Sequence, residues 1–201
     1  MGRVIVHLLD HDAKSYRDLI LYACLNNTTY DTQVEGYKTD YMMDIINLTD
    51  EPGYYRDEIL TATKSIADDD DSWQAGYLLD LITAFAKQGD NEAKQLIYDY
   101  GERTIKDEDS RAVSAIIEID GIDGLTYVLN KITPLKNRQN DFHWYEGLLW
   151  ELEEVMGESE ANNTLDTLRK TNKHVNDYLT FLEEKKRDLE ARRSTGSTPP
   201  K

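Results

Sequence analysis

The feature that most constrains the fold of this chain is a helical period in its apolar residues. In SYRDLILYACL, residues 15–25, apolar side chains recur every three or four positions and so share one face of a helix. The one stretch that approaches the alternating pattern of a strand is RVIVHLL, residues 3–9. The chain is therefore predicted to be all-α. The helical period returns at residues 37–48, 51–66, 72–89, 91–103, 110–121 and 121–132.

Two blocks of the sequence share one organisation. One begins at Asp71 and the other at Asp109, 38 residues later, and each opens with Asp-Ser. Each continues as one predicted helix, breaks at a turn that contains Gly and Asp, and continues as a second helix. The spacing is close to the roughly 40 residues of known helix-pair repeats. One helical hairpin cannot bury its apolar face alone, so such pairs are expected to stack on one another.

With SRAVSAIIEIDGIDGLTYVL as its clearest unit, the stretch of residues 15–132 resembles the HEAT-type helical repeats of bacterial proteins without assigned chemistry. The resemblance implies an α-solenoid, an architecture that usually presents a protein-binding surface. HEAT-like relatives also include enzymes, among them DNA glycosylases. The two blocks differ in length before the turn, 17 residues against 11, so the frame of the earlier repeats stays open.

The C-terminal third of the chain has a different pattern, which predicts two longer helices. FHWYEGLLWELEEVMGE, residues 142–158, predicts a strongly apolar helix, and a second helix is predicted to begin near Ser159. The second helix can fold back on residues 141–156 as an antiparallel hairpin, pair with another chain as a coiled coil, or stand alone in solvent. Asn172 and Lys186 interrupt its apolar seam, which is a candidate for self-association as a homodimer. The seam consists of Leu165, Leu168, Val175, Leu179, Leu182 and Leu189.

These patterns predict three parts of the chain. Residues 1–133 form a HEAT-like helical repeat domain, and residues 134–193 form a C-terminal two-helix hairpin or coiled-coil segment. Residues 194–201 form a flexible tail. The predicted fold class is an all-α solenoid of HEAT-like helix pairs, followed by a long-helix hairpin or coiled coil.

The balance of charge limits which partners the protein can bind. The chain has 39 Asp and Glu against 23 Lys and Arg, a net charge of −16. Such a surface repels phosphate backbones, so we expect a protein partner with a basic surface and no nucleic acid. The longest apolar run near the N-terminus, VIVHLL, is too short to span a bilayer, so no membrane is expected. Because the only cysteine is Cys24, no intrachain disulfide can form, and a cytoplasmic location is expected.

The stretch HLLDHD, residues 7–12, tests whether the protein holds a metal. A helix there would place His7 and His11 on one face, where they could bridge an ion. A zinc site needs three or four ligands, however, and His143 and His174 are far away in sequence. We interpret the stretch as a capping segment and predict no metal, no cofactor and no catalytic residue.

Two acidic stretches are the predicted partner-binding sites. ADDDDSW, residues 67–73, does not place a Gly and an acidic ligand where an EF-hand loop requires them, and its carboxylates suit a helix N-terminus or a basic partner. TTYDTQVEGY, residues 28–37, puts aromatic and acidic side chains in one loop, which suits a basic peptide or an amine, or else a helix cap at the core edge. The predicted partner-binding residues are Tyr30, Asp31, Gln33, Glu35, Tyr37, Asp68, Asp69, Asp70 and Asp71.

These observations predict a non-catalytic protein–protein interaction scaffold whose acidic surface receives a basic partner. An alternative is a regulatory or nucleic-acid-mimicking component of a larger complex, because an acidic body can occupy a basic site. The third hypothesis is a HEAT-like enzyme acting on nucleic acid. It would need a basic groove, whereas residues 1–157 hold 31 acidic and 14 basic residues.

Overall fold

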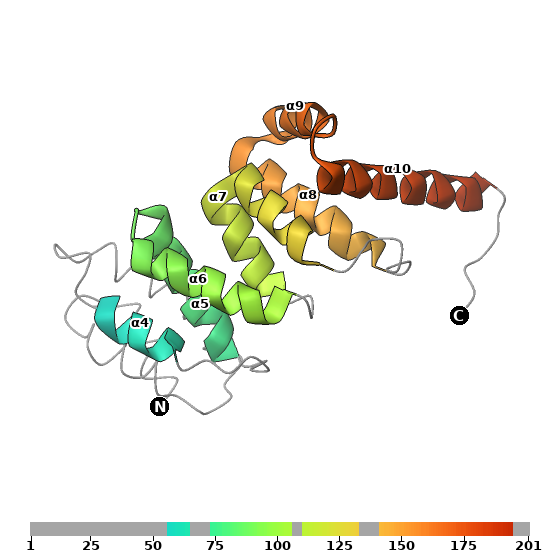
Figure 1. Ribbon diagram of the computed structural model, residues 1–201. Helices are drawn as coiled ribbons and strands as arrows, with labels where there is room; N and C mark the ends of the chain where they lie inside the picture. The colour runs from blue at the N-terminus through green and yellow to red at the C-terminus, as the bar shows by residue number, and fades with distance from the viewer. Residues whose placement is uncertain (1–55, 65–72, 106–109, 133–140, 195–201) are drawn as a thin grey trace, which may run out of the picture. The chain divides into compact units, whose positions relative to one another are not determined.

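The computed structural model describes residues 56–64, 73–105, 110–132 and 141–194 of the chain (Figure 1). Within these ranges the structure is helical and contains no strand, which confirms the all-α prediction. The strand-like RVIVHLL stretch lies outside them. The helices are α4 (Arg56–Lys64), α5 (Trp73–Lys87), α6 (Asn91–Thr104), α7 (Ser110–Lys131), α8 (Phe142–Met156), α9 (Glu158–Leu168) and α10 (Lys173–Ser194).

The chain divides into two compact units, Met1–Tyr100 and Gly101–Lys201, and the division falls within α6. The first unit contains α4, α5 and most of α6. The second contains the last turn of α6 together with α7, α8, α9 and α10. The domain boundary predicted from the sequence, between residues 133 and 134, lies outside the described residues, and so do residues 195–201 of the predicted tail.

The first unit is organised around a tight turn between α5 and α6. Gly89, with a φ of +94°, follows the end of α5, as the sequence predicted. The backbone N–H groups of Gly89 and Asp90 donate to the carbonyls of Ala86 and Phe85, at 2.9 and 3.1 Å, and so satisfy two carbonyls at the helix end. The Asp90 carboxylate then accepts two backbone N–H groups from the first turn of α6 and caps that helix.

α4 and α5 pack against each other. The buried residues of α4 are Ile59, Leu60 and Thr63, and the Thr63 hydroxyl donates to the Ile59 carbonyl at 2.8 Å, so its polar atom is satisfied in the core. The buried apolar residues of α5 are Leu78, Leu79, Leu81, Ile82, Phe85 and Ala86.

α7 is a kinked helix pair rather than one straight helix. Gly121 has a φ of +54° and a ψ of −122°, outside the helical region, and divides α7 into two helical segments. Gly124, in the second segment, lies directly against the first: a Cβ on Gly124 would be 2.4 Å from the carbonyl oxygen of Ile116. The pair α5–α6 and the two segments of α7 thus each consist of two helical segments joined at a glycine with a positive φ.

α8, α9 and α10 complete the second unit. α8 buries Tyr145, Leu148 and Leu152 and contacts α7, α9 and α10. The Tyr178 hydroxyl of α10 donates to the Tyr145 carbonyl at 2.9 Å, and the rings of Phe181 and Tyr145 meet edge to face with centroids 5.2 Å apart. Among the arrangements that the sequence left open, α10 thus packs back on α8 of its own chain (Figure 1).

The interpretation of residues 159–189 as one continuous helix is wrong. The structure breaks this stretch between α9 and α10, at residues 169–172. Asn172 caps α10 because its side-chain oxygen accepts two backbone N–H groups, at 3.0 and 3.2 Å. The apolar residues stay in helical phase across the break, so their spacing did not reveal it.

The six residues of the predicted seam have different environments. Leu165 and Val175 are buried in the second unit, Leu189 is exposed, and the other three are half-buried. Leu189 belongs to the C-terminal part of α10, where residues 186–194 are all exposed. Self-association through this helix stays a prediction.

Candidate functional site

The partner-binding residues predicted from the sequence, in 28–37 and 68–71, lie outside the described residues, and so do His7 and His11. Within the part of the chain that the structure describes, no group of three or more His, Cys, Asp or Glu side chains is placed to hold a metal ion. In the same part, no helix combines the length and the apolar character needed to cross a membrane. Among the described residues, we consider three groups of paired charges that join different segments of the chain, and one exposed helix face.

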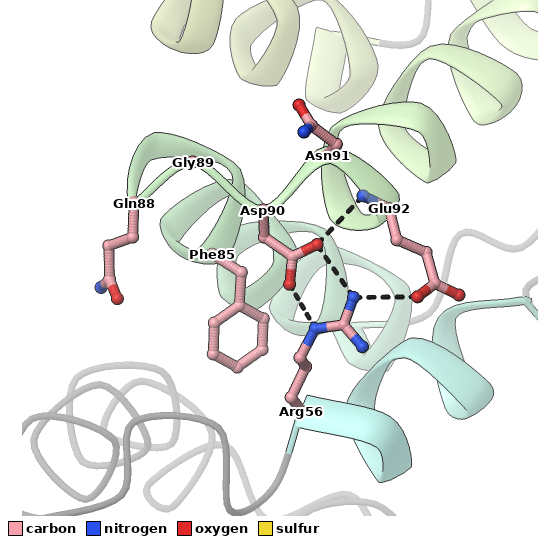
Figure 2. Close-up of a pocket in the computed structure, with 7 residues that line it drawn as sticks. All are labelled: Arg56, Phe85, Gln88, Gly89, Asp90, Asn91 and Glu92. Carbon is pink, nitrogen blue, oxygen red and sulfur yellow. Dashed lines mark hydrogen bonds and ion pairs between the residues drawn. The ribbon is translucent and has the colours of Figure 1, made fainter.

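The first group surrounds Arg56, at the start of α4 (Figure 2). Arg56 donates through Nε and Nη2 to the two carboxylate oxygens of Asp90, and through Nη2 to Glu92 at 2.8 Å. Lys64 donates to the other carboxylate oxygen of Glu92 at 2.9 Å. These contacts connect α4 to the turn between α5 and α6. An open pocket of about 550 Å³ lies beside them, lined by Arg56, Phe85, Gln88, Gly89, Asp90, Asn91 and Glu92.

The charges around Arg56 satisfy one another. The hydrogen bonds from Arg56 lower the pKa of Asp90 to about 2, against an ordinary value of 3.8. The hydrogen bonds from Lys64 and Arg56 likewise lower the pKa of Glu92. Both carboxylates therefore stay ionised and engaged with cations of the same unit. We call this group the clamp, because it joins α4 to the turn between α5 and α6 and pairs its charges within the unit.

The other two groups, both in the second unit, are paired in the same way. Glu102 accepts the Tyr127 hydroxyl at 2.5 Å and Lys131 Nζ at 2.9 Å. Arg169 donates to both carboxylate oxygens of Glu183, at 2.5 and 3.1 Å. These donors lower the pKa of Glu102 and the pKa of Glu183. The first pairing links α6 to α7 and the second supports the break between α9 and α10, so both serve the fold.

The side of α8 that faces away from the core is different, because it exposes a tryptophan. A helix turns by about 100° per residue, which places Trp150 opposite the buried residues Tyr145, Leu148 and Leu152. Trp150 is 56 % exposed, more than any other large hydrophobic side chain in the described residues. We define the outer face of α8 as the half-buried to exposed stripe around it, which consists of His143, Glu146, Gly147, Trp150, Glu153 and Glu154. Within this face, His143 Nδ1 lies 3.5 Å from a carboxylate oxygen of Glu146.

Gly147, on the same outer face, has no role in the packing of the described residues. A Cβ at Gly147 would have nothing within 4 Å, whereas Gly101 and Gly124 lie against neighbouring atoms and Gly89 and Gly121 have positive φ. A glycine inside a helix costs about 1 kcal/mol relative to alanine. Gly147 and Trp150 are three positions apart and therefore adjacent on the helix surface. Gly147 lowers the stability of the helix, and Trp150 buries little of its side chain. These two residues, neither of which stabilises the fold, are therefore neighbours on the surface.

The surroundings of this face are strongly acidic. Residues 141–168, which include α8 and α9, contain eight acidic residues and no lysine or arginine. Residues 169–194, by contrast, contain eight basic and five acidic residues. Burial raises the pKa of the Tyr178 phenol, and the negative charges of Glu153 and Glu146 raise it further.

The apolar pattern of residues 142–158 did not distinguish Trp150 or Gly147 from their neighbours. Trp150 is out of phase with the buried residues Tyr145, Leu148 and Leu152. A helical projection of residues 142–156 would have shown a tryptophan and a glycine together among carboxylates. The predicted sites lie instead in loops and acidic runs, whose composition can be read directly along the sequence without placing residues around a helix.

Comparisons of this chain with protein-family models, with curated proteins and with solved structures found no match. What the protein does must therefore be inferred from its own residues.

Proposed function

We propose that this protein is a non-catalytic interaction module that binds a partner protein with a basic surface. The observation that carries the proposal is the unbalanced charge of α8 and α9, which hold seven acidic residues without a lysine or arginine. Within the described residues, Glu154, Glu158 and Glu160 are exposed and enter no ion pair. Carboxylates clustered in this way repel one another, and a basic partner relieves that repulsion.

The architecture belongs to the same proposal. The pair α5–α6 and the two segments of α7 each consist of two helical segments joined by a turn, and we propose that they are HEAT-like repeats of an α-solenoid. Solenoids present extended surfaces that bind other proteins. The acidic residues predicted at 28–37 and 68–71 would contribute to the same negative surface.

The test is a pull-down from the native cell lysate at low ionic strength, with the full 201-residue chain as bait. An acid-neutralised variant carries Glu154→Gln, Glu158→Gln and Glu160→Gln. A matched variant carries Glu184→Gln, Asp188→Asn and Glu190→Gln, which removes the same charge from exposed positions of α10. The proposal expects a stoichiometric partner that is lost with the first variant, kept with the second, and released as salt screens the charges.

Three results would contradict the proposal: recovery of the bait alone, equal retention by both variants, or binding insensitive to salt. Residues 141–168, which contain no lysine or arginine, also favour a second candidate function, in which the protein mimics nucleic acid. That candidate expects the captured partner to be a nucleic-acid-binding protein, and added DNA or RNA to displace the bait from it.

A further inference from the structure

We propose that the outer face of α8 binds an arginine-bearing segment of the partner protein, with Trp150 as the anchor and Gly147 as the opening beside it. The inference rests on the proposed function, since it names the chemistry of the partner at one place on the acidic surface. It concerns His143, Glu146, Gly147, Trp150, Glu153 and Glu154, all on one helix.

Trp150 has carboxylates on both sides along the helix. Glu146 lies four positions before it, Glu153 three after and Glu154 four after, and these spacings make side chains neighbours on a helix surface. An indole ring attracts cations through the negative charge on its face. A cation bound on the face of Trp150 would therefore also be within reach of carboxylates. The same cation could then contact the indole ring and pair with a glutamate.

Gly147 leaves room for such a group. Positions three and four apart are neighbours on a helix surface, so the turn that contains Glu146 and Gly147 lies beside Trp150. Apart from the two chain neighbours of Gly147 and the helix backbone, no atom lies within 4 Å of a Cβ built on Gly147, so the indole leaves that space open. A partner side chain can thus lie flat along the helix at Gly147 and meet the ring from the side.

Arginine fits this arrangement better than the other cationic or apolar side chains. Its planar guanidinium stacks on an aromatic ring while its N–H groups point outward in the plane, toward carboxylates such as Glu146 and Glu154. Lysine presents a single ammonium point charge and cannot stack. An apolar segment would leave the surrounding carboxylates desolvated and without partners, which is unfavourable.

The experiment measures fluorescence anisotropy of a labelled short peptide of alternating arginine and alanine, titrated with the full chain at low ionic strength. Two further probes replace arginine by lysine or by citrulline, the neutral isostere of arginine. The proposal expects the arginine peptide to bind more tightly than the lysine peptide, and the citrulline peptide to show no saturable binding.

Variants of the outer face distinguish the contribution of Trp150 to binding from that of the surrounding carboxylates. We expect Trp150→Ala to weaken arginine-peptide binding about threefold to tenfold, and Trp150→Phe, which keeps a ring, about twofold. His174→Ala, at an exposed ring near the start of α10, is the matched control and should leave binding unchanged. Thermal unfolding should be the same for these chains, because both side chains lie largely outside the core.

Gly147→Leu is the variant that a purely structural account cannot explain. Leucine is a better helix former than glycine and meets open space here, so the variant should be at least as stable as the parent chain. It fills the opening beside Trp150 and should weaken binding to a similar extent as Trp150→Ala. Asn163→Leu, at an exposed position of α9, supplies the matched control.

The outcomes distinguish this inference from the function on which it rests. If the arginine peptide does not bind in a salt-dependent manner, both fail. If it binds and the neutralised variant of Glu154, Glu158 and Glu160 weakens it, while Trp150→Ala and Gly147→Leu change nothing, the acidic module stands and the Trp150 anchor is overturned. Equal affinity for arginine and lysine peptides would also overturn the choice of arginine.

Discussion

The turn between α5 and α6 and the outer face of α8 treat their carboxylates in opposite ways. At the turn, Asp90 and Glu92 are bound by Arg56 and Lys64, and Asp90 also caps α6. On α8, carboxylates surround an exposed tryptophan, and no lysine or arginine occurs in 141–168. Carboxylates paired with Lys or Arg hold helices in place. Carboxylates in a segment without Lys or Arg can instead bind a basic partner. The contrast separates residues that serve the fold from residues that serve binding.

The largest effect is expected when the clamp at the turn is broken. Arg56→Met leaves Asp90 and Glu92 close together without their shared cation, so we expect a loss of about 2 kcal/mol in the free energy of unfolding. Urea unfolding followed by circular dichroism measures it. Arg187→Met removes an exposed arginine of α10 and should change stability little. If both variants lose the same free energy of unfolding, the Arg56 group stabilises the fold no more than an exposed arginine does.

Acid should weaken the clamp in a defined range of pH. The folded-state pKa of Asp90 is lowered to about 2 from an ordinary 3.8, so its stabilisation is complete above the ordinary value and disappears as pH falls toward 2. The loss amounts to about 2 kcal/mol for the parent chain. Urea midpoints measured between neutral pH and pH 2 test this prediction.

Asp90→Asn provides the reference for the acid titration, because asparagine can still cap α6 but carries no charge to titrate. The variant should be less stable than the parent chain at neutral pH, and the difference should shrink as the pH falls. Parallel pH profiles for the two chains would show that the Asp90 carboxylate contributes nothing through its ionisation.

The smallest effect has the opposite sign and concerns the outer face of α8. Gly147→Ala should raise the free energy of unfolding by about 0.5–1 kcal/mol, because alanine favours the helix and its methyl group meets no atom. Gly157→Ala, at a φ of +85°, should lower it by about 1 kcal/mol instead. If Gly147→Ala destabilises the chain, Gly147 serves packing after all and the comparison with the clamp no longer holds.

Local features of the fold could be predicted well. Gly89 and Gly121 each end a helical segment with a positive φ, and each stands at a turn that the sequence indicated. A glycine at the end of an apolar period acts through its own backbone, so no distant residue is needed to interpret it. Asn172 shows the limit of this reasoning. A polar residue such as Asn172 can lie inside one long helix or cap a second helix. The sequence looks the same in both cases when the apolar residues stay in helical phase.

The amino-acid sequence by itself determined that the described chain is helical, where its glycine turns lie, and how its charge is distributed. Only the tertiary structure decided which carboxylates meet a cation, since Arg56 and Asp90 are 34 residues apart. It also decided that Trp150 faces outward while Tyr178 is buried against Tyr145. Backbone conformation is governed by neighbours along the chain, whereas burial and charge pairing depend on contacts between helices that the chain brings together only when it folds.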